Sequence, residues 1–380
     1  MDAKELKQTL PTLSRSELEA LRDDLECMLS TESAGSFEHV IDDRRFSAGA
    51  QCPHCQGTHV SRDGKVCGKQ RYICMDCHKT FGSTTNSIVA YTKKDLSVWQ
   101  QYIRCMVNRL PLRACAERCD ITLDTAFNWR HKILQALAAV DREPLSGIVE
   151  ADETYFPDNF KGNRNAIRNL KKNPGDQSDD HDVSNNTPAY KQHRESGHKH
   201  SRGKSTSKRG LSRQKICVPC AIDRNGRVRG LAAGRGKVKT EYLHTAYDGH
   251  IAGSSTLVTD KDASDRNFAA ANRLALVQLA AKTASRKGLY NLQKANNLHG
   301  QLKQFVDNFK NVATKHLDNY IMWLSWNIEH RGMTAKAAAE EIMRCAFGSF
   351  YRIRSSEISQ KSALPFESKV DTKIQYCIRT

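Results

Sequence analysis

Four cysteines are spaced as the ligands of a single metal ion. They form two Cys-x-x-Cys pairs, Cys52 with Cys55 and Cys74 with Cys77, and 18 residues separate the pairs. Two intervening residues let both thiolates of a pair turn onto one ion, and the stretch between the pairs can form a hairpin that brings them together. The spacing predicts a zinc ribbon with a closed, structural four-thiolate site, which folds its module and does no chemistry.

The other cysteines are predicted to be reduced residues of the interior. Cys67 and His78 lie near the two pairs, but the ligand set is complete without them. Cys217 and Cys220 form a third Cys-x-x-Cys, which lacks a partner pair and lies in a strand-like run. The total of 13 cysteines is odd and no secretion signal opens the chain, so a disulfide framework is not expected.

Two aspartates stand where strand-like segments end. Asp152 follows the segment 148–151, and Asp260 follows the apolar segment 257–259. A carboxylate at the end of a buried strand is held rigidly, and two such groups side by side can bind a pair of divalent cations. Cations about 4 Å apart can activate a water or a 3′ hydroxyl and stabilise the leaving oxygen during attack on a phosphodiester. The aspartates therefore predict a catalytic site for Mg²⁺ or Mn²⁺.

Three neighbouring acids, Glu150, Glu153 and Asp262, compete for these roles. Residues two apart on a strand share a face, so Glu150 lies on the same side as Asp152 and the pattern does not exclude it. For either aspartate alone, a solvated acid at the start of a loop is an equal alternative. Their joint occurrence in a chain with DNA-binding features favours the catalytic interpretation.

The chain carries a large positive charge that is spread along its length. Its 59 Lys and Arg residues exceed its 42 Asp and Glu residues, which gives a formal net charge of +17. This excess predicts a polyanionic partner, in this case double-stranded DNA. No segment reaches the roughly 18 consecutive apolar residues of a membrane-spanning helix, so we expect a cytoplasmic protein without a membrane partner.

A helical pattern runs from about 95 to 140. One apolar face follows Asp95, a second short helix follows Pro111, and Thr122 is the expected N-cap of a third helix. Two short helices joined by a tight turn are the layout of a helix-turn-helix, whose last helix lies in the DNA major groove. The alternative is a bare three-helix bundle that does not bind DNA. The polar candidates for contact with bases or phosphates are Thr125, Asn128, Arg130 and Lys132.

The stretch between the two cysteine pairs adds basic side chains on a predicted hairpin. Side chains of this kind suit contact with DNA phosphates. They are Lys65, Lys69, Arg71 and Lys79, with Tyr72 among them.

Composition divides the chain into successive regions. A helical lead-in (1–45) precedes the zinc ribbon (46–90) and the helix-turn-helix (91–142), and a tail (351–380) closes the chain. Between them lies the region 143–350, which is mostly helical after 263. Its strand-like segments are 147–156, 216–223, 227–232 and 255–258.

Two features of the region 143–350 bear on its folding. Asn225-Gly226, between the second and third strand-like segments, is a strong hairpin signal. A basic, polar run at 160–214 follows the first strand and is expected to be disordered, because it has too little apolar surface to offset the entropy of ordering. It binds target DNA or serves as a solvated tether.

Taken in order, these stretches resemble a known family. The chain carries CPHC and RYICMDC in the ribbon, TAFNWRHKIL in the third helix, VEADETYF around Asp152 and LVTD at Asp260. They resemble the ISXO-like branch of the DDE insertion-sequence transposases, over about residues 50 to 330. The resemblance implies an α/β catalytic domain at 143–350 that is RNase H-like, with a mixed sheet and flanking helices. It also implies Asp152 on the first strand, Asp260 after the fourth, and a third ligand on a following helix.

The third ligand position departs from a plain D-D-E pattern. The family has a lysine after the third ligand, and the corresponding helix here holds no Glu or Asp before Lys303. His299 is the preferred candidate and Asn296 the next, because both share a face with Lys303 and can offer a nitrogen or a neutral oxygen to a metal. Alternatively, His299 packs or binds phosphate, and Glu329 on a later helix supplies the acid. Lys303 is expected to bind a DNA phosphate.

The resemblance implies a DNA transposase of a bacterial insertion sequence, associated with the nucleoid. Such an enzyme binds terminal inverted repeats and target DNA and catalyses divalent-metal-dependent strand cleavage and strand transfer. Because paired ends need two active sites, a homo-oligomer of at least two chains is expected. Two alternatives stay open: an inactive DNA-binding protein or regulator derived from such a transposase, and a nuclease on the same fold that cuts without joining.

Overall fold

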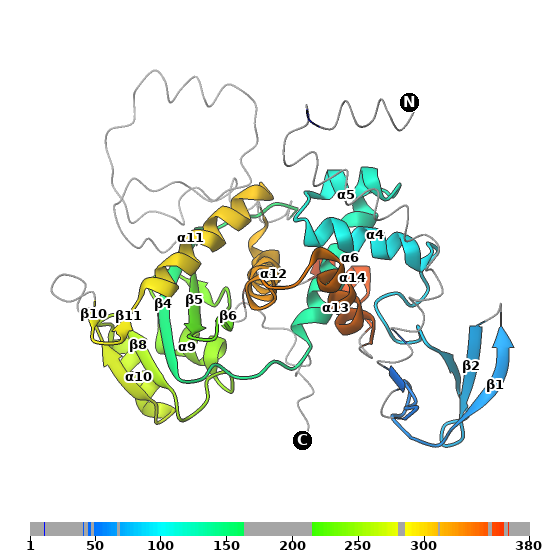
Figure 1. The fold of residues 1–380 in the computed structure, drawn as a ribbon, viewed down its shortest axis with the longest axis horizontal. Helices are drawn as coiled ribbons and strands as arrows, with labels where there is room; N and C mark the ends of the chain where they lie inside the picture. Colours follow the sequence, from blue (N-terminus) through cyan, green and yellow to red (C-terminus); the bar gives the residue numbers. More distant parts are fainter. Residues whose placement is uncertain are drawn as a thin grey trace, which may run out of the picture. The chain divides into compact units, whose positions relative to one another are not determined.

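The computed structural model divides the chain into two compact units, 1–140 with 332–358 and 141–331 with 359–380. Each unit is described by itself, with the element labels of Figure 1. The structure describes residues 11, 41, 45–46, 49–66, 69–162, 215–279, 286–310, 312–348, 352–360 and 364. Most of the predicted lead-in (1–45) and tail (351–380), Cys67, and the predicted insertion beyond residue 162 lie outside these residues.

The ribbon of the first unit is a sheet of three short antiparallel strands, β1 (Val60–Val66), β2 (Lys69–Cys74) and β3 (Thr80–Gly82). The Tyr72 ring lies between those of Phe46 and Phe81, at centroid distances of 4.9 and 5.6 Å. Tyr72 is thus a packing residue rather than part of a free basic surface. A core this small needs a further source of stability, such as a metal ion.

Three helices follow the ribbon, as the sequence predicts: α4 (Leu96–Val107), α5 (Leu112–Arg118) and α6 (Leu123–Ala138). Pro111 precedes the first residue of α5, and the Thr122 hydroxyl accepts a hydrogen bond from the Thr125 backbone N–H at the start of α6 (3.2 Å). The indole rings of Trp99 and Trp129 stack with centroids 3.8 Å apart and join α4 to α6.

The first unit is completed by a segment from much later in the chain. Helix α13 (Ala335–Gly348) packs against α4 and α6, and the Phe347 ring meets the Trp99 indole edge-on at 5.7 Å. The predicted region 143–350 therefore extends too far, since its last helix belongs with the three-helix region. The periodicity of an apolar helix face does not say which core the face joins. The short helix α14 (Ser355–Gln360) follows.

The second unit is built on a mixed sheet with the order β6-β5-β4-β8-β9, in which β7 also pairs with β5. The pairs β4-β8 and β8-β9 are parallel, and β5 runs antiparallel to β4 and β6. Gly226, with a φ of +86°, makes the predicted turn between β5 and β6. The strands are β4 (Ile148–Pro157), β5 (Lys215–Asp223), β6 (Val228–Gly230), β7 (Gly234–Arg235), β8 (Thr256–Thr259) and β9 (Ala275–Gln278).

The two faces of β4 meet different helices because side chains alternate along a strand. Val149 and Ala151 join a core cluster with α9 (Thr240–Tyr247) and α10 (Ala263–Ala271). Glu150 and Asp152 point to the other face, where α11 (Gln293–Asn308) contacts β4 and β5 (Figure 1). The remaining elements are β10 (Arg286–Lys287), β11 (Tyr290–Asn291), η3 (Thr314–His316) and α12 (Leu317–Glu329).

The second unit is therefore a mixed α/β structure, as predicted. Cys217 and Cys220 are both buried in β5, in agreement with the prediction that they belong to the core. None of the helices within the described residues combines the length and apolar composition that a membrane span requires.

Candidate metal centres

The four predicted thiolates converge in the ribbon. The Sγ atoms of Cys52 and Cys77 are 3.7 Å apart, those of Cys55 and Cys74 are 3.6 Å apart, and all four lie within 4.8 Å of one another. Four Zn–S bonds of about 2.3 Å in a tetrahedron require sulfur separations of roughly 3.8 Å. The cluster can therefore hold a structural zinc ion.

The two Cys-x-x-Cys pairs form the same kind of backbone turn. The N–H of Gln56 donates to the Cys52 carbonyl (2.8 Å), and the N–H of His78 donates to the Cys74 carbonyl (2.9 Å). Gln56 and His78 both have positive φ, 65° and 56°. His78 is thus a turn residue with an exposed side chain, in agreement with the prediction that it is not a ligand. Backbone N–H groups of Cys77 and Asp76 lower the pKa of the Cys74 thiol to about 7. At Cys55 the Gly57 hydrogen bond is outweighed by burial and the neighbouring thiols, which raise the pKa to about 12, so a metal ion would have to displace a proton there.

In the second unit, the parallel pairing of β4 and β8 brings the two predicted aspartates together. Val149 pairs with Leu257 and Glu150 with Val258, so Asp152 and Asp260 follow at equivalent positions. Strand β4 (Ile148–Pro157) confirms the strand-like segment predicted at 147–156, so Asp152 lies within the strand and not at its end. Strand β8 ends at Thr259, before Asp260. Among the described residues, its pairing with β4 therefore stops short of Asp152.

The electrostatics of Asp152 reflect this proximity. Burial raises the pKa of Asp152 to about 6, a hydrogen bond from the Glu153 N–H opposes the rise, and the charge of Asp260 adds to it. The charge of Lys303 lowers the same pKa. Like charges held together in a partly buried site favour a bound proton or a bound cation.

Two further carboxylates, Glu153 and Asp265, extend the acidic site. Burial and the neighbouring acids, with Asp265 first among them, raise the pKa of Glu153 to about 8. Burial and then Asp260 raise the pKa of Asp265, on α10, to about 7. Sequence reasoning missed Asp265, although the spacing of Asp260, Asp262 and Asp265 across a helix start was a visible signal.

Asp262, a predicted competitor, has a structural role. Its Oδ1 accepts the Ser264 N–H (2.8 Å) and caps α10, and its Oδ2 pairs with the Lys237 amine (2.9 Å). The Lys237 partnership, with the Ser264 hydrogen bonds, lowers the pKa of Asp262 against the opposing effect of burial. Because both oxygens have partners, Asp262 is a poorer cation ligand than Asp260.

Glu150, the other competitor, anchors a helix. Its side chain is fully buried, and it accepts the N–H groups of Lys294 (2.7 Å) and Ala295 (3.3 Å) in the first turn of α11. It also pairs with the Arg224 guanidinium (2.9 Å). A carboxylate at a helix N-terminus satisfies backbone donors that have no partner within the helix. Glu150 therefore positions α11, and with it the candidate third ligand.

Helix α11 brings His299 to Asp152. The His299 Nδ1 lies 3.8 Å from the Asp152 Oδ2, which is too long for a hydrogen bond. The Nε2 atom is buried and has no hydrogen-bond partner among the described residues. Burial lowers the pKa of His299 to about 4, so the ring is neutral at pH 7 and carries a lone pair for a metal. Asn296 and Lys303 are exposed on the same helix.

Asp152, Asp260 and His299 fit a divalent cation in donor type, with two carboxylates and one imidazole, whose buried Nε2 has no hydrogen-bond partner among the described residues. Within the described part of the chain, the four cysteines are the one group of three or more possible ligands that lies close enough to hold a metal ion. Asp152, Asp260 and His299 do not form such a group, so water would have to complete the coordination of a cation there.

Glu329 lies elsewhere. It is on the packing helix α12, as the sequence predicts, where it accepts the Val228 N–H (3.0 Å) and pairs with Arg229 (3.2 Å) and Arg142 (3.4 Å). These partners occupy the carboxylate, so Glu329 does not take the third ligand position.

The predicted DNA-contact residues of α6 divide into two groups. Arg130 is buried, and its guanidinium donates to the Leu110 carbonyl (2.7 Å) and the Cys115 Sγ (3.3 Å). Its prediction as a DNA contact is corrected: Arg130 joins the helices from inside. Thr125, Asn128 and Lys132 are partly exposed. In the ribbon, Lys65, Lys69 and Arg71 are exposed, and Arg71 pairs with Asp63 at 2.8 Å.

No family model matches the chain. A 122-residue stretch is 32% identical to an uncharacterized protein in the transposable element ISH50 of Halobacterium salinarum. The chain is thus similar to a transposable-element protein. The match covers 31% of the chain and 40% of that relative's length. It indicates a transposase-related protein, and activity, substrate and partners are matters of proposal.

Proposed function

We propose that the protein is a DDE-type DNA transposase of a bacterial insertion sequence, which binds terminal inverted repeats and cuts and joins DNA strands with divalent cations. The observation that carries this proposal is the proximity of Asp152, on β4, to Asp260, just after the neighbouring parallel strand β8, with His299 against Asp152. The similarity to a transposable-element protein supports it.

The sheet supports an RNase H-like catalytic domain. Asp152 lies on the first strand of the sheet in chain order, Asp260 follows a later parallel strand, and α11 comes after both. This is the order that the sequence resemblance implies for two aspartates and a third ligand on a helix.

Each residue of the site would have a distinct role. The N–H of Glu153 holds one Asp152 oxygen (2.9 Å) and the N–H of Asp262 holds one Asp260 oxygen (3.2 Å), which leaves the second oxygen of each carboxylate for a cation. His299, as a neutral ring, is the third ligand. Bound cations would activate water or a 3′ hydroxyl and stabilise the leaving oxygen. The exposed amine of Lys303 would hold a phosphate of the DNA.

DNA binding is proposed for the first unit. A zinc ion on the four cysteines would stabilise the ribbon, and α4, α5 and α6 would serve as the helix-turn-helix. The contacts would come from Thr125, Asn128, Lys132, Lys65, Lys69 and Arg71. We propose that at least two chains act together on paired ends.

The experiment is cleavage of terminal-repeat DNA by the full chain with Mg²⁺ or Mn²⁺. Asp152→Asn and Asp260→Asn should each reduce cleavage and strand joining by roughly a thousandfold, because each removes a cation ligand. Asp307→Asn is the matched control, since Asp307 is an exposed acid on α11. Unchanged cleavage in the Asp152 and Asp260 variants would contradict the proposal.

The absence of a carboxylate at the third position favours a second candidate, a DNA-binding protein derived from a transposase but inactive in cleavage. It predicts DNA binding without cleavage at any cation concentration. A pre-cut end distinguishes a further alternative: an enzyme that cleaves terminal repeats but never inserts a pre-cut end is a nuclease.

A further inference from the structure

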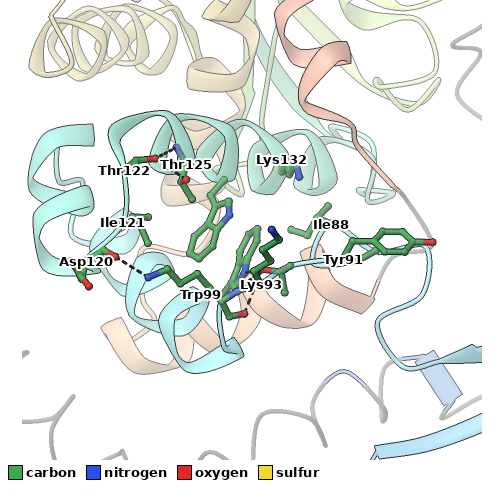
Figure 2. Close-up of a pocket in the computed structure, with 13 residues that line it drawn as sticks. Ile88, Tyr91, Lys93, Trp99, Asp120, Ile121, Thr122, Thr125 and Lys132 are labelled. Atoms are coloured by element: carbon green, nitrogen blue, oxygen red, sulfur yellow. Dashed lines mark hydrogen bonds between the residues drawn. The ribbon is translucent and has the colours of Figure 1, made fainter. Parts of the chain in front are cut away.

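A pocket of about 620 Å³ opens in the first unit (Figure 2). This volume falls within the range of small-molecule sites, roughly 300–1,000 Å³. The pocket is lined by the loop 88–94 that leads from the ribbon to α4, by Trp99, by the turn between α5 and α6, and by α6 itself. Neither zinc binding nor the carboxylate chemistry uses it.

Side-chain contacts hold the walls of the pocket in place. The Trp99 Nε1 donates to the Thr92 hydroxyl (3.1 Å) and ties the loop to α4. The stacking of Trp99 on Trp129 ties α4 to α6. The Lys94 amine donates to the Asp120 carbonyl (3.0 Å) and ties the loop to the turn before α6. The pocket is therefore preformed, which reduces the entropic cost of binding.

The charge of the pocket favours an anion. Three lysines line it, Lys93, Lys94 and Lys132, against one acid, Asp120. Within the described part of the chain, Lys93 and Lys132 form no ion pair or hydrogen bond through their amines. Burial, and then the charge of Arg352, lower the pKa of Lys132, and the charge of Glu357 opposes them. An anion beside Lys132 would stabilise its partly buried charge.

The rest of the lining is larger and more apolar than a bare phosphate requires. Ile121 and Trp129 give the lining an apolar part. Thr122 and Thr125 also line the pocket at the start of α6, where their hydroxyls hydrogen-bond to each other (2.9 Å, Figure 2). At the rim, the Tyr91 ring is 84% exposed and points away from the pocket. The Arg352 guanidinium lies over one face of this ring, 4.8 Å from the centroid, so a base would stack on the opposite face.

We propose that this pocket binds one nucleotide of a DNA strand, with its phosphate at Lys93, Lys94 and Lys132 and its sugar and base against Ile121 and Trp129. The next base along the strand would stack on Tyr91. The inference rests on the proposed function in taking DNA as the ligand. The same chemistry would also accept a free nucleotide, so the test compares both sources.

The test measures binding of labelled duplex and single-stranded DNA to the full chain over a range of salt concentrations. Lys93→Gln combined with Lys132→Gln should weaken binding at least tenfold and reduce the slope of log K against log salt by about 1, because both lysines contact the same phosphate. Lys336→Gln, an exposed lysine on α13, is the matched control and should bind as the unsubstituted chain does. Equal zinc content and thermal unfolding establish that the double variant is folded.

The outcomes separate this inference from the proposed function. If the unsubstituted chain cleaves DNA and the double variant keeps its full DNA affinity, the pocket inference and the proposed DNA contact of Lys132 are both overturned, while the proposed cleavage activity stands. If the unsubstituted chain binds no DNA, the chain is titrated with deoxyadenosine monophosphate and the indole fluorescence is measured. This titration tests whether the pocket binds a free nucleotide. A saturable change that the double variant lacks supports a site for free nucleotides, and no change overturns the inference.

Discussion

The thiolate site and the candidate carboxylate site show two ways of bringing possible metal ligands together. In the ribbon, each pair of ligands comes from one turn, and the two turns have the same backbone hydrogen bonds. In the second unit, the ligands come from two strands and a helix that are distant in the chain, and a buried acid, Glu150, holds the helix in place. The first site is compact and complete in itself, whereas the second depends on the whole fold around it.

The largest effect should follow removal of a zinc ligand. Cys74→Ser should abolish stoichiometric zinc binding and unfold the ribbon, because structural zinc supplies about 10 kcal/mol or more to a module with so small a core. Metal analysis and limited proteolysis measure this. Cys345→Ser, a half-buried cysteine outside the cluster, should keep one zinc per chain. A Cys74 variant that retained its zinc would contradict the assignment of Cys74 as a ligand of a structural zinc site.

The second largest effect should follow substitution of Glu150, which anchors α11. Glu150→Gln removes a fully buried charge that holds two backbone N–H groups and Arg224, so the free energy of unfolding should fall by about 3 kcal/mol. Glu143→Gln removes the partner of Arg227 at the surface, where its side chain is 75% exposed, and should cost less than about 1 kcal/mol. Urea unfolding of the two variants compares them. Equal losses would contradict the anchoring role.

The third ligand gives a smaller effect that distinguishes between two residues of one helix. His299→Ala should lower metal-dependent cleavage roughly 10- to 100-fold, while Asn296→Ala should change it little, because His299 is the residue against Asp152. His299→Glu should retain cleavage with Mg²⁺, since an added carboxylate oxygen suits that ion. A larger loss of cleavage in Asn296→Ala than in His299→Ala would contradict the choice of His299 as the third ligand.

The smallest effect concerns pH and the metal-free protein. Because the pKa of Glu153 is raised from 4.5 to about 8 in the folded state, its contribution to stability is fully present below pH 4.5 and is lost as the pH rises through 8. Glu153→Gln should therefore stabilise the metal-free protein at pH 9, on the order of 1 kcal/mol, and change little at pH 4. Thermal unfolding in the presence of a chelator measures the difference. Equal stabilisation at both pH values would show that charge is not the cause.

Sequence alone predicted the features that local spacing determines. The cysteine pairs, the Thr122 cap and the Asn225-Gly226 turn each depend on a few adjacent residues, and the structure contains all three. The adjacency of Asp152 and Asp260 required the parallel pairing of β4 and β8, which the residues alone do not specify.

The missed features depend on long-range packing. Arg130 has the composition of a DNA contact, but its position on α6 turns it toward Leu110 and Cys115. Helix α13 has an ordinary amphipathic pattern, and only the Trp99 contact reveals which core it joins. The pocket beside Trp129 likewise forms where three segments meet, so no single stretch of sequence marks it.

The register of β4 has a consequence for the folding pathway. Glu150, which anchors α11, and Asp152, which faces His299, are two residues apart on one face of the strand, and nine consecutive pairs with β5 fix their positions. A one-residue slip would turn both side chains to the opposite face at once. A misregistered intermediate would lose the helix anchor and the metal site together. Any strand-cutting capacity of this chain would therefore appear only after β4 and β5 have paired in the correct register.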